Sequence, residues 1–414
     1  MKKYDKYKTS GIQWIGQIPE GWEVCKFKHF ANQITTPSKD SNKIGLENIE
    51  SATGRFVKTN SEFDGNGIHF LQNDIVYGKL RPYLKKVWMA EFEGNAVGDF
   101  FVYRCKDNSF PNFVKYLMLS EGFTDVANGS TTGAKMPRVS SSFISNLSCA
   151  LPSPDEQRDI AAYLDDKTGK IDKATEAINK QIDDLRSYRQ SLISETVTKG
   201  LNPDAPMKDS GIQWIGQIPK HWEVCKFKHF AIQITTPSKD SNKIGLENIE
   251  SATGRFVKTN SEFDGNGIHF LQNDIVYGKL RPYLKKVWMA KFEGNAVGDF
   301  FVYRCKDNSF PAFVKYLMLS EGFTDIANGS TTGAKMPRVS SSFISDLSCA
   351  LPSPDEQETI SAFLDKKTAK IDEAIKALET QRDDLAMLKQ SLISEAVTGK
   401  VDVRGWNSNN ETRN

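Results

Sequence analysis

Apolar residues recur every seven positions in two long stretches of the chain. The first stretch, from Asp155 to about Lys199, contains no proline, and charged residues fill the positions between the apolar ones. This spacing predicts two long helices that pair along an apolar seam, each on the order of 65 Å long at ~1.5 Å per residue. The seam residues are Leu164, Ile171, Ile178, Leu185 and Leu192 in one helix and Leu364, Ile371, Leu378, Leu385 and Leu392 in the other.

The rest of the chain has a different pattern, in which short β-rich or alternating runs are separated by clusters of Gly, Asn and Asp. The runs 22–27, 54–58, 74–77, 87–90 and 100–104 predict strands. Residues 113–120 carry apolar side chains at helical spacing, and Pro111 marks a suitable helix start. A mixed α+β globule follows.

This globular sequence occurs twice. Residues 10–157 return as residues 210–357 without insertion, and seven positions differ. The differences are scattered: Glu20/Lys220, Gly21/His221, Asn32/Ile232, Glu91/Lys291, Asn112/Ala312, Val126/Ile326 and Asn146/Asp346. Both copies therefore present nearly the same surface, and a ligand of one copy should bind the other.

The order of these parts predicts the domain organisation. We expect globular domains at 1–153 and 211–353, helices at 154–199 and 354–400, a linker at 200–210 and a tail at 401–414. A chain of 414 residues is long enough for two separate cores. Each helix has an apolar stripe that must be covered, so the two helices should pack on each other, and the short linker favours an antiparallel coiled coil.

Composition excludes several classes of protein. The net charge of +2 gives no bulk attraction to nucleic acid; Lys and Arg number 15 against 14 Asp and Glu in residues 11–150, and 17 against 13 in 211–350. The six cysteines form no CxxC pair, which disfavours zinc and an internal disulfide framework. The sequence also lacks a signal-peptide pattern and a long apolar span, so we expect a cytoplasmic protein without a membrane segment.

Signals for catalysis are weak. The sequence has no Walker A loop, GxGxxG, HExxH or adenine-methyltransferase tetrapeptide, and its few histidines suit packing or surface positions better than catalysis. Pro154-Asp155 followed by Asp165-Asp166-Lys167 loosely matches a nuclease PD…(D/E)xK pattern. Both parts fall at the start of one predicted helix, where acidic residues complement the helix dipole, so we expect no catalytic or metal site.

Two polar and basic segments are the better candidates for binding, and each occurs in both copies. Lys and Arg can neutralise phosphates, Tyr and Arg can contact bases, and glycine allows close approach of the backbone. A solvated turn and a flexible loop are the plain alternatives. The candidate residues are Tyr77, Lys79, Arg81, Tyr83, Lys85, Lys86, Ser130, Thr131, Thr132, Lys135 and Arg138, with a weaker Lys39, and Tyr277, Lys279, Arg281, Tyr283, Lys285, Lys286, Ser330, Thr331, Thr332, Lys335, Arg338 and Lys239.

In this order, the segments resemble the specificity subunit of type I restriction-modification enzymes over essentially the whole chain. The matching marks are Trp14-Ile15-Gly16-Gln17-Ile18-Pro19, the Tyr77–Lys86 block, Gly133-Ala134-Lys135-Met136-Pro137-Arg138, Leu151-Pro152-Ser153-Pro154-Asp155-Glu156-Gln157 and Ser191-Leu192-Ile193-Ser194-Glu195. Each mark alone is weakly specific, but two ordered sets are highly specific.

The resemblance implies a non-catalytic DNA reader. Its globular domains would be target recognition domains that each read half of a split site in double-stranded DNA, with the coiled coil as a ruler between them. Two modification subunits would supply S-adenosylmethionine-dependent adenine methylation, and restriction subunits would add ATP- and Mg²⁺-dependent translocation and cleavage in a bacterial or archaeal cytoplasm. This chain would itself bind no cofactor. A coiled-coil protein scaffold and a stand-alone DNA-modifying enzyme stay as alternatives.

One departure from the family pattern affects the expected target. Typical members pair two different recognition domains, whereas here 77–86 equals 277–286 and 128–138 equals 328–338. We therefore expect an interrupted palindrome. Among the seven differences, Asn32/Ile232 lies nearest a candidate segment, Thr35–Lys39.

Overall fold

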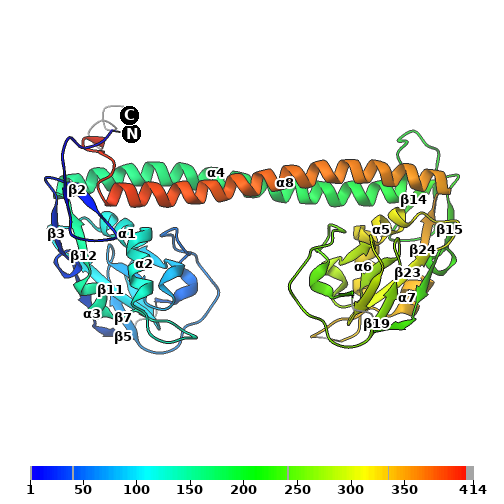
Figure 1. The fold of residues 1–414 in the computed structure, drawn as a ribbon, viewed down its shortest axis with the longest axis horizontal. Helices are drawn as coiled ribbons and strands as arrows, with labels where there is room; N and C mark the ends of the chain where they lie inside the picture. Colours follow the sequence, from blue (N-terminus) through cyan, green and yellow to red (C-terminus); the bar gives the residue numbers. More distant parts are fainter. Residues whose placement is uncertain (1, 40–41, 240–241, 334, 407–414) are drawn as a thin grey trace. The chain divides into compact units, whose positions relative to one another are not determined.

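The computed structural model describes residues 2–39, 42–239, 242–333 and 335–406. Its contacts divide the chain into two compact units (Figure 1). The first unit combines Met1–Ile178 with Thr380–Asn414, and the second is Asn179–Glu379. Two long helices, α4 (Pro154–Lys199) and α8 (Pro354–Val397), cross the boundary between the units. Each unit therefore holds one copy of the repeat and a part of both helices.

The two copies fold into the same series of elements. The first copy contains β1 Tyr7–Thr9, β2 Gln17–Pro19, β3 Glu23–Lys26, β4 Ala31–Ile34, β5 Pro37–Ser38, β6 Lys43–Ile44, β7 Gly67–Phe70, β8 Ile75–Gly78, β9 Val87–Met89, β10 Gly94–Val97, β11 Phe100–Cys105, α1 Pro111–Leu119, α2 Glu121–Gly129, α3 Ser141–Asn146 and β12 Ser148–Leu151. The second contains β13 Met207–Asp209, β14 Gln217–Pro219, β15 Glu223–Lys226, β16 Ala231–Ile234, β17 Pro237–Ser238, β18 Lys243–Ile244, β19 Gly267–Phe270, β20 Ile275–Gly278, β21 Val287–Met289, β22 Gly294–Val297, β23 Phe300–Cys305, α5 Pro311–Leu319, α6 Glu321–Gly329, α7 Ser341–Asp346 and β24 Ser348–Leu351.

Two four-stranded sheets form the centre of each globule. In the first copy their strand orders are β4-β11-β8-β9 and β5-β7-β10-β6, and the second copy repeats both orders. All pairings are antiparallel except that of β6 with β10, and of β18 with β22 in the second copy. The predicted mixed α+β class, with two similar domains and two long helices, is confirmed.

Side chains of the central strands alternate between two cores. Val76 and Val102 pack with Phe70 and Trp88 between the two sheets. Tyr77, on the opposite face, belongs to the same core as Leu117 of α1 and Phe123 of α2. Since successive side chains of a strand point to opposite faces, both faces of the sheet are buried at its central strand β8, which is apolar along its whole length.

The long helices pair within each unit. In the second unit, Arg186 contacts Glu379 at 3.0 Å and Arg189 contacts Asp372 at 3.1 Å, so rising numbers on α4 meet falling numbers on α8. In the first unit, Lys389 of α8 donates to Asp172 of α4, and the N–H of Gly405, in the segment that follows α8, donates to Asp159 near the start of α4, which gives the same antiparallel direction. All ten predicted seam residues are buried or half-buried. The two long paired helices are thus confirmed.

Three local features differ from the sequence predictions or extend them. The expected strand 54–58 is wrong: Phe56 makes only an isolated bridge to Ile49, because positive φ values at Ala52 and Gly54 turn the chain there. Residues 207–209, within the predicted linker, form β13 and pair with β14. Of the predicted tail, residues 401–406 pack on the first unit, and 407–414 lie outside the described residues.

The helices in the described part of the chain include none with an apolar stretch of the length that a membrane span requires.

Candidate nucleic-acid interface

The structure brings the two predicted basic segments together. We call residues 79–86 and 130–138 the loop pair, with 279–286, 330–333 and 335–338 as the described part of its second copy. A backbone bridge joins Leu80 to Arg138, the Arg81 N–H donates to the Pro137 carbonyl at 2.8 Å, and the Val139 N–H donates to the Lys79 carbonyl at 3.1 Å. The second copy repeats all three contacts. Segments about 55 residues apart in sequence therefore form one continuous surface.

A third segment, the turn Gly98-Asp99 between β10 and β11, fastens the loop pair. The Arg138 guanidinium donates to both Asp99 oxygens at 3.0 and 2.9 Å, and Lys79 Nζ lies 3.8 Å from the same carboxylate. Arg138 and Lys79 hold the pKa of Asp99 below its usual value. Asp299 makes the same contacts in the second copy.

The exposed side chains of the loop pair include Arg81, Tyr83, Lys135 and Met136, together with Thr132, Ala134 and Arg138. The Tyr83 side chain is 51% and the Met136 side chain 47% exposed. The described copies of these residues, including Lys335, are exposed as well. Cations beside exposed aromatic and thioether groups suit phosphates and base edges together.

The backbone that carries Arg81 and Tyr83 is strained. Arg81 and Lys85 have φ values of 50° and 48°, on either side of the 3-10 turn Pro82–Leu84, and Arg281 and Lys285 repeat them at 51° and 49°. A left-handed conformation in a non-glycine residue costs roughly 1–2 kcal/mol. Hydrogen bonds from the Leu84 and Lys85 N–H groups back to Arg81 and Pro82 fix the turn. The exposed side chains therefore project from a defined backbone.

Other predicted residues point inward. Tyr77 and Tyr277 are each 2% exposed in the core, and burial raises the pKa of both phenols. Lys86 donates to the carbonyls of Leu46 and Ile49, as Lys286 does to those of Leu246 and Ile249. Burial lowers the pKa of both lysines. These side chains stabilise the globule and are not presented to a ligand.

Lys85 also serves the fold, because it faces the helices. Its ammonium donates to Gln390 of α8 at 2.6 Å in the first unit, and Lys285 donates to Gln190 of α4 at 2.7 Å in the second. Burial lowers the pKa of both lysines. The turn that exposes Arg81 on one side is thus tied to the helices on the other.

The remaining predicted residues divide between caps and surface. The Ser130 and Thr131 hydroxyls donate to the carbonyls of Ala127 and Asn128 at the end of α2, and Ser330 and Thr331 repeat this on α6. Thr132 and Thr332 pair through the backbone with Arg138 and Arg338. Lys39 and Lys239 are exposed after β5 and β17, outside the loop pair.

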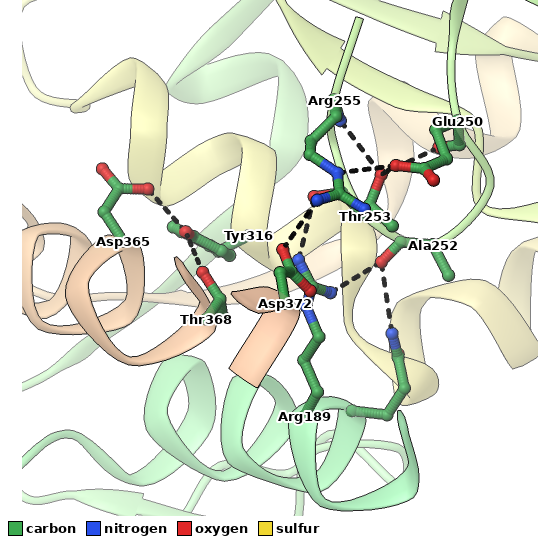
Figure 2. Close-up of polar contacts among 10 residues, drawn as sticks. Arg189, Glu250, Ala252, Thr253, Arg255, Tyr316, Asp365, Thr368 and Asp372 are labelled. Atoms are coloured by element: carbon green, nitrogen blue, oxygen red, sulfur yellow. Dashed lines mark hydrogen bonds and ion pairs between the residues drawn. The ribbon is translucent and has the colours of Figure 1, made fainter. Parts of the chain in front are cut away.

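The helices hold each globule through a polar junction that differs between the units. In the second unit, the Arg189 guanidinium donates to the carbonyls of Ala252 and Thr253 at 2.7 and 2.9 Å and pairs with Asp372 at 3.1 Å (Figure 2). In the first unit, the equivalent residue is Lys389, which bonds Asp172 at 2.7 Å. At this position the arginine of the second unit binds the globule and the facing helix, whereas the contact of the lysine in the first unit joins α8 to α4.

The sequence differences between the copies lie outside the loop pair. The clearest structural effect is at Asn146/Asp346, where Asp346 pairs with Lys226 and Lys228 and its pKa is lowered by both. Ile232, the counterpart of Asn32, is exposed on β16. The loop pairs themselves are equivalent.

Sequence reasoning missed Asp99 and Arg189. A Gly-Asp pair between two apolar strands is a turn signal, and it marks the position of Asp99. Its partners come from segments 20 and 39 residues away, so the signal does not reveal the contact. The loss of exact repeat at Arg189 and Lys389 is visible in the aligned helices.

Comparisons with known proteins agree with this arrangement. No protein-family model matches the chain. The chain is 25% identical to the type I restriction enzyme EcoDI specificity subunit of Escherichia coli, over 67% of each protein. It is 24% identical to the MjaVIII specificity subunit of Methanocaldococcus jannaschii, with 94% of this chain and 95% of that protein covered.

Solved structures give the same result for the fold. A chain from a structure on complex assembly and conformational transition of the type I R-M system matches with a TM-score of 0.71 and 15% identity, covering 93% of this chain and 99% of that one. The HsdS subunit from Thermoanaerobacter tengcongensis matches with a TM-score of 0.51 and 16% identity, covering 93% and 98%. Two sheet-containing domains joined by long helices are shared throughout.

Proposed function

We propose that this chain, a homologue of the type I restriction enzyme specificity subunits, is the DNA-recognition subunit of a type I restriction-modification complex. The observation that carries the proposal is the loop pair, which presents Arg81, Tyr83, Lys135 and Met136 together and occurs twice. Cations position a protein on the phosphate backbone, and contacts with base edges supply specificity. The chain recognises DNA and carries out no reaction itself.

The target is bipartite, and its halves are alike. Each copy reads one half-site, and the identical loop pairs give both half-sites the same sequence. Within each unit α4 and α8 run in opposite directions, which supports an inverted rather than a direct repeat. The expected target is an interrupted palindrome.

The chemistry belongs to partner subunits in a bacterial or archaeal cytoplasm. Two modification subunits bind S-adenosylmethionine and methylate adenine, and restriction subunits use ATP and Mg²⁺. This chain binds none of these cofactors and directs the partners to the site. The distance between the half-sites depends on the two long helices.

Sequencing of methylated bases tests the proposal. The chain is expressed with its modification subunit in a host without other adenine methylation, and a host with the modification subunit alone is the control. We expect one interrupted palindromic motif with methyladenine on both strands. A methylome equal to the control would refute DNA recognition, whereas an asymmetric bipartite motif or a direct repeat would refute only the palindrome.

A further inference from the structure

An acidic residue occupies the middle of the basic loop pair in each copy. Asp99 takes both of its ion pairs from cations of the loop pair, Arg138 and Lys79, and Asp299 repeats this arrangement. The three segments involved come from the turn after β10, the end of β8 and the stretch before α3. A carboxylate at such a position repels phosphates, so it opposes general affinity for DNA.

The geometry fixes what the carboxylate does. Arg138 uses Nε and one terminal nitrogen to contact the two oxygens of Asp99, which holds the guanidinium in one plane. The Lys79 N–H also donates to the Asp99 carbonyl at 2.9 Å, so the backbone of the turn is joined to the same loop. Asp99 therefore fixes Arg138 and the loop 130–138 relative to the exposed Arg81.

We propose that Asp99 and Asp299 are positioning residues that determine specificity, because each holds an exposed arginine, Arg138 or Arg338, in a fixed ion pair that prevents it from contacting phosphates indiscriminately. The proposal rests on DNA recognition by the loop pair. A fixed arginine preserves the orientation of Lys135 and Met136 toward the DNA. A released arginine acts as an additional mobile phosphate contact that binds any sequence.

Aspartate-to-asparagine substitutions separate these effects. Three variants are needed: Asp99→Asn, Asp299→Asn and the double variant. Asparagine keeps the shape and the backbone hydrogen bond, but it removes the negative charge and the ion pairs. The full chain with its modification subunits is titrated with two duplexes, one containing the methylated motif and one lacking it, between 50 and 200 mM salt.

The expected change is a loss of discrimination. One additional phosphate contact per copy steepens the dependence of log K on log salt by about 0.9 for the duplex without the motif. Each substituted copy therefore loses about 3-fold more affinity for that duplex between 50 and 200 mM salt. Affinity for that duplex at 50 mM salt rises, and the ratio of specific to non-specific affinity falls. Because the copies are equivalent, Asp99→Asn and Asp299→Asn should give equal effects, and the double variant should give both.

A matched control separates position from total charge. Glu93→Gln with Glu293→Gln makes the same charge change at the opposite end of β10 and β22, where each carboxylate pairs with a histidine. Equal salt slopes in this control and in the aspartate variant would overturn the proposal. Arg138→Lys keeps the cation and loses the two-pronged contact, so it should lower the affinity ratio through weaker specific binding.

Two further outcomes would also overturn it. Unchanged slope and affinity ratio in the double asparagine variant would show that Asp99 does not restrain Arg138 in this way. If the Asp99→Asn variant directed methylation to a motif with a different base sequence, Asp99 would itself contact a base and would not act through Arg138. Failure of DNA recognition as such appears separately, because the unmodified complex would then not distinguish the two duplexes.

Discussion

The junction between the helices and the second globule makes Arg189 the most informative residue to change. Its side chain is 5% exposed and contacts the Ala252 and Thr253 carbonyls and the Asp372 carboxylate (Figure 2). The first unit has lysine at the equivalent position, with Asp172 as its partner. Arg189→Lys therefore places in the second unit the side chain that the first has at this position, and Lys389→Arg does the reverse.

The size of the effect follows from the contacts that change. Lysine retains the charge near Asp372 but cannot reach two carbonyls and a carboxylate in a fixed plane. A hydrogen bond to a charged group contributes about 1.5–3 kcal/mol, so the loss of one such bond lowers the local opening free energy by about 1.5 kcal/mol or more. This corresponds to a roughly tenfold larger equilibrium constant for local opening. Arg189→Ala removes the hydrogen bonds to both carbonyls as well as the ion pair, so it should lower the opening free energy further than Arg189→Lys, although Asp372 retains Arg255, 3.6 Å away, as an ion-pair partner.

Hydrogen exchange measures this opening locally. The peptides 50–55 and 250–255 have the same sequence, so a Ser51→Thr marker in every variant distinguishes them by mass. Arg189→Lys should speed exchange at 250–255 about tenfold and leave 50–55 unchanged. Lys389→Arg should slow exchange at 50–55. Equal exchange of both segments in the unsubstituted chain, or equal changes in both, would refute the reasoning.

Two other predictions concern the loop pair and the C-terminal segment. Arg81→Ala or Arg281→Ala should weaken binding to the methylated motif by about 1–3 kcal/mol, equally for either copy, whereas Tyr77→Phe with Tyr277→Phe should leave the affinity unchanged. An electrophoretic shift titration measures both affinities, and an unaltered affinity in the arginine variants would exclude this loop from the interface. Arg404 lowers the pKa of Asp402 from 3.8 to about 2, so the contribution of the ionised Asp402 to the docking of residues 401–406 is present above pH 4 and is lost as the pH falls toward 2. Trp406 fluorescence should report this transition, and Asp402→Asn should abolish it.

Much of the architecture follows from patterns that repeat in the sequence. The spacing of Leu164, Ile171 and Ile178 defines a helix seam without any tertiary information, and the copied segments show that the surface occurs twice. The adjacency of 79–86 and 130–138 was not predictable in the same way. It depends on backbone bridges between two loops that come together only when the whole globule has folded.

The candidate residues show where local sequence is ambiguous. Tyr77 lies beside several cations in sequence, yet β8 is buried on both faces and Tyr77 belongs to its core. Lys85 and Lys86 donate to groups of the protein, because carbonyls and an amide within reach of their ammonium groups need donors. Composition alone cannot separate such lysines from Lys135, which is exposed.

The chain segments that form each unit determine the order in which the two units can be completed during synthesis. The second unit is one continuous stretch, Asn179–Glu379, whereas the first needs Thr380 and the residues after it. Val397 and Val401 belong to the same core as Trp22, and the Asp402 N–H donates to the Lys2 carbonyl. Since domains fold as their residues leave the ribosome, the copy that is translated first is the last to be completed.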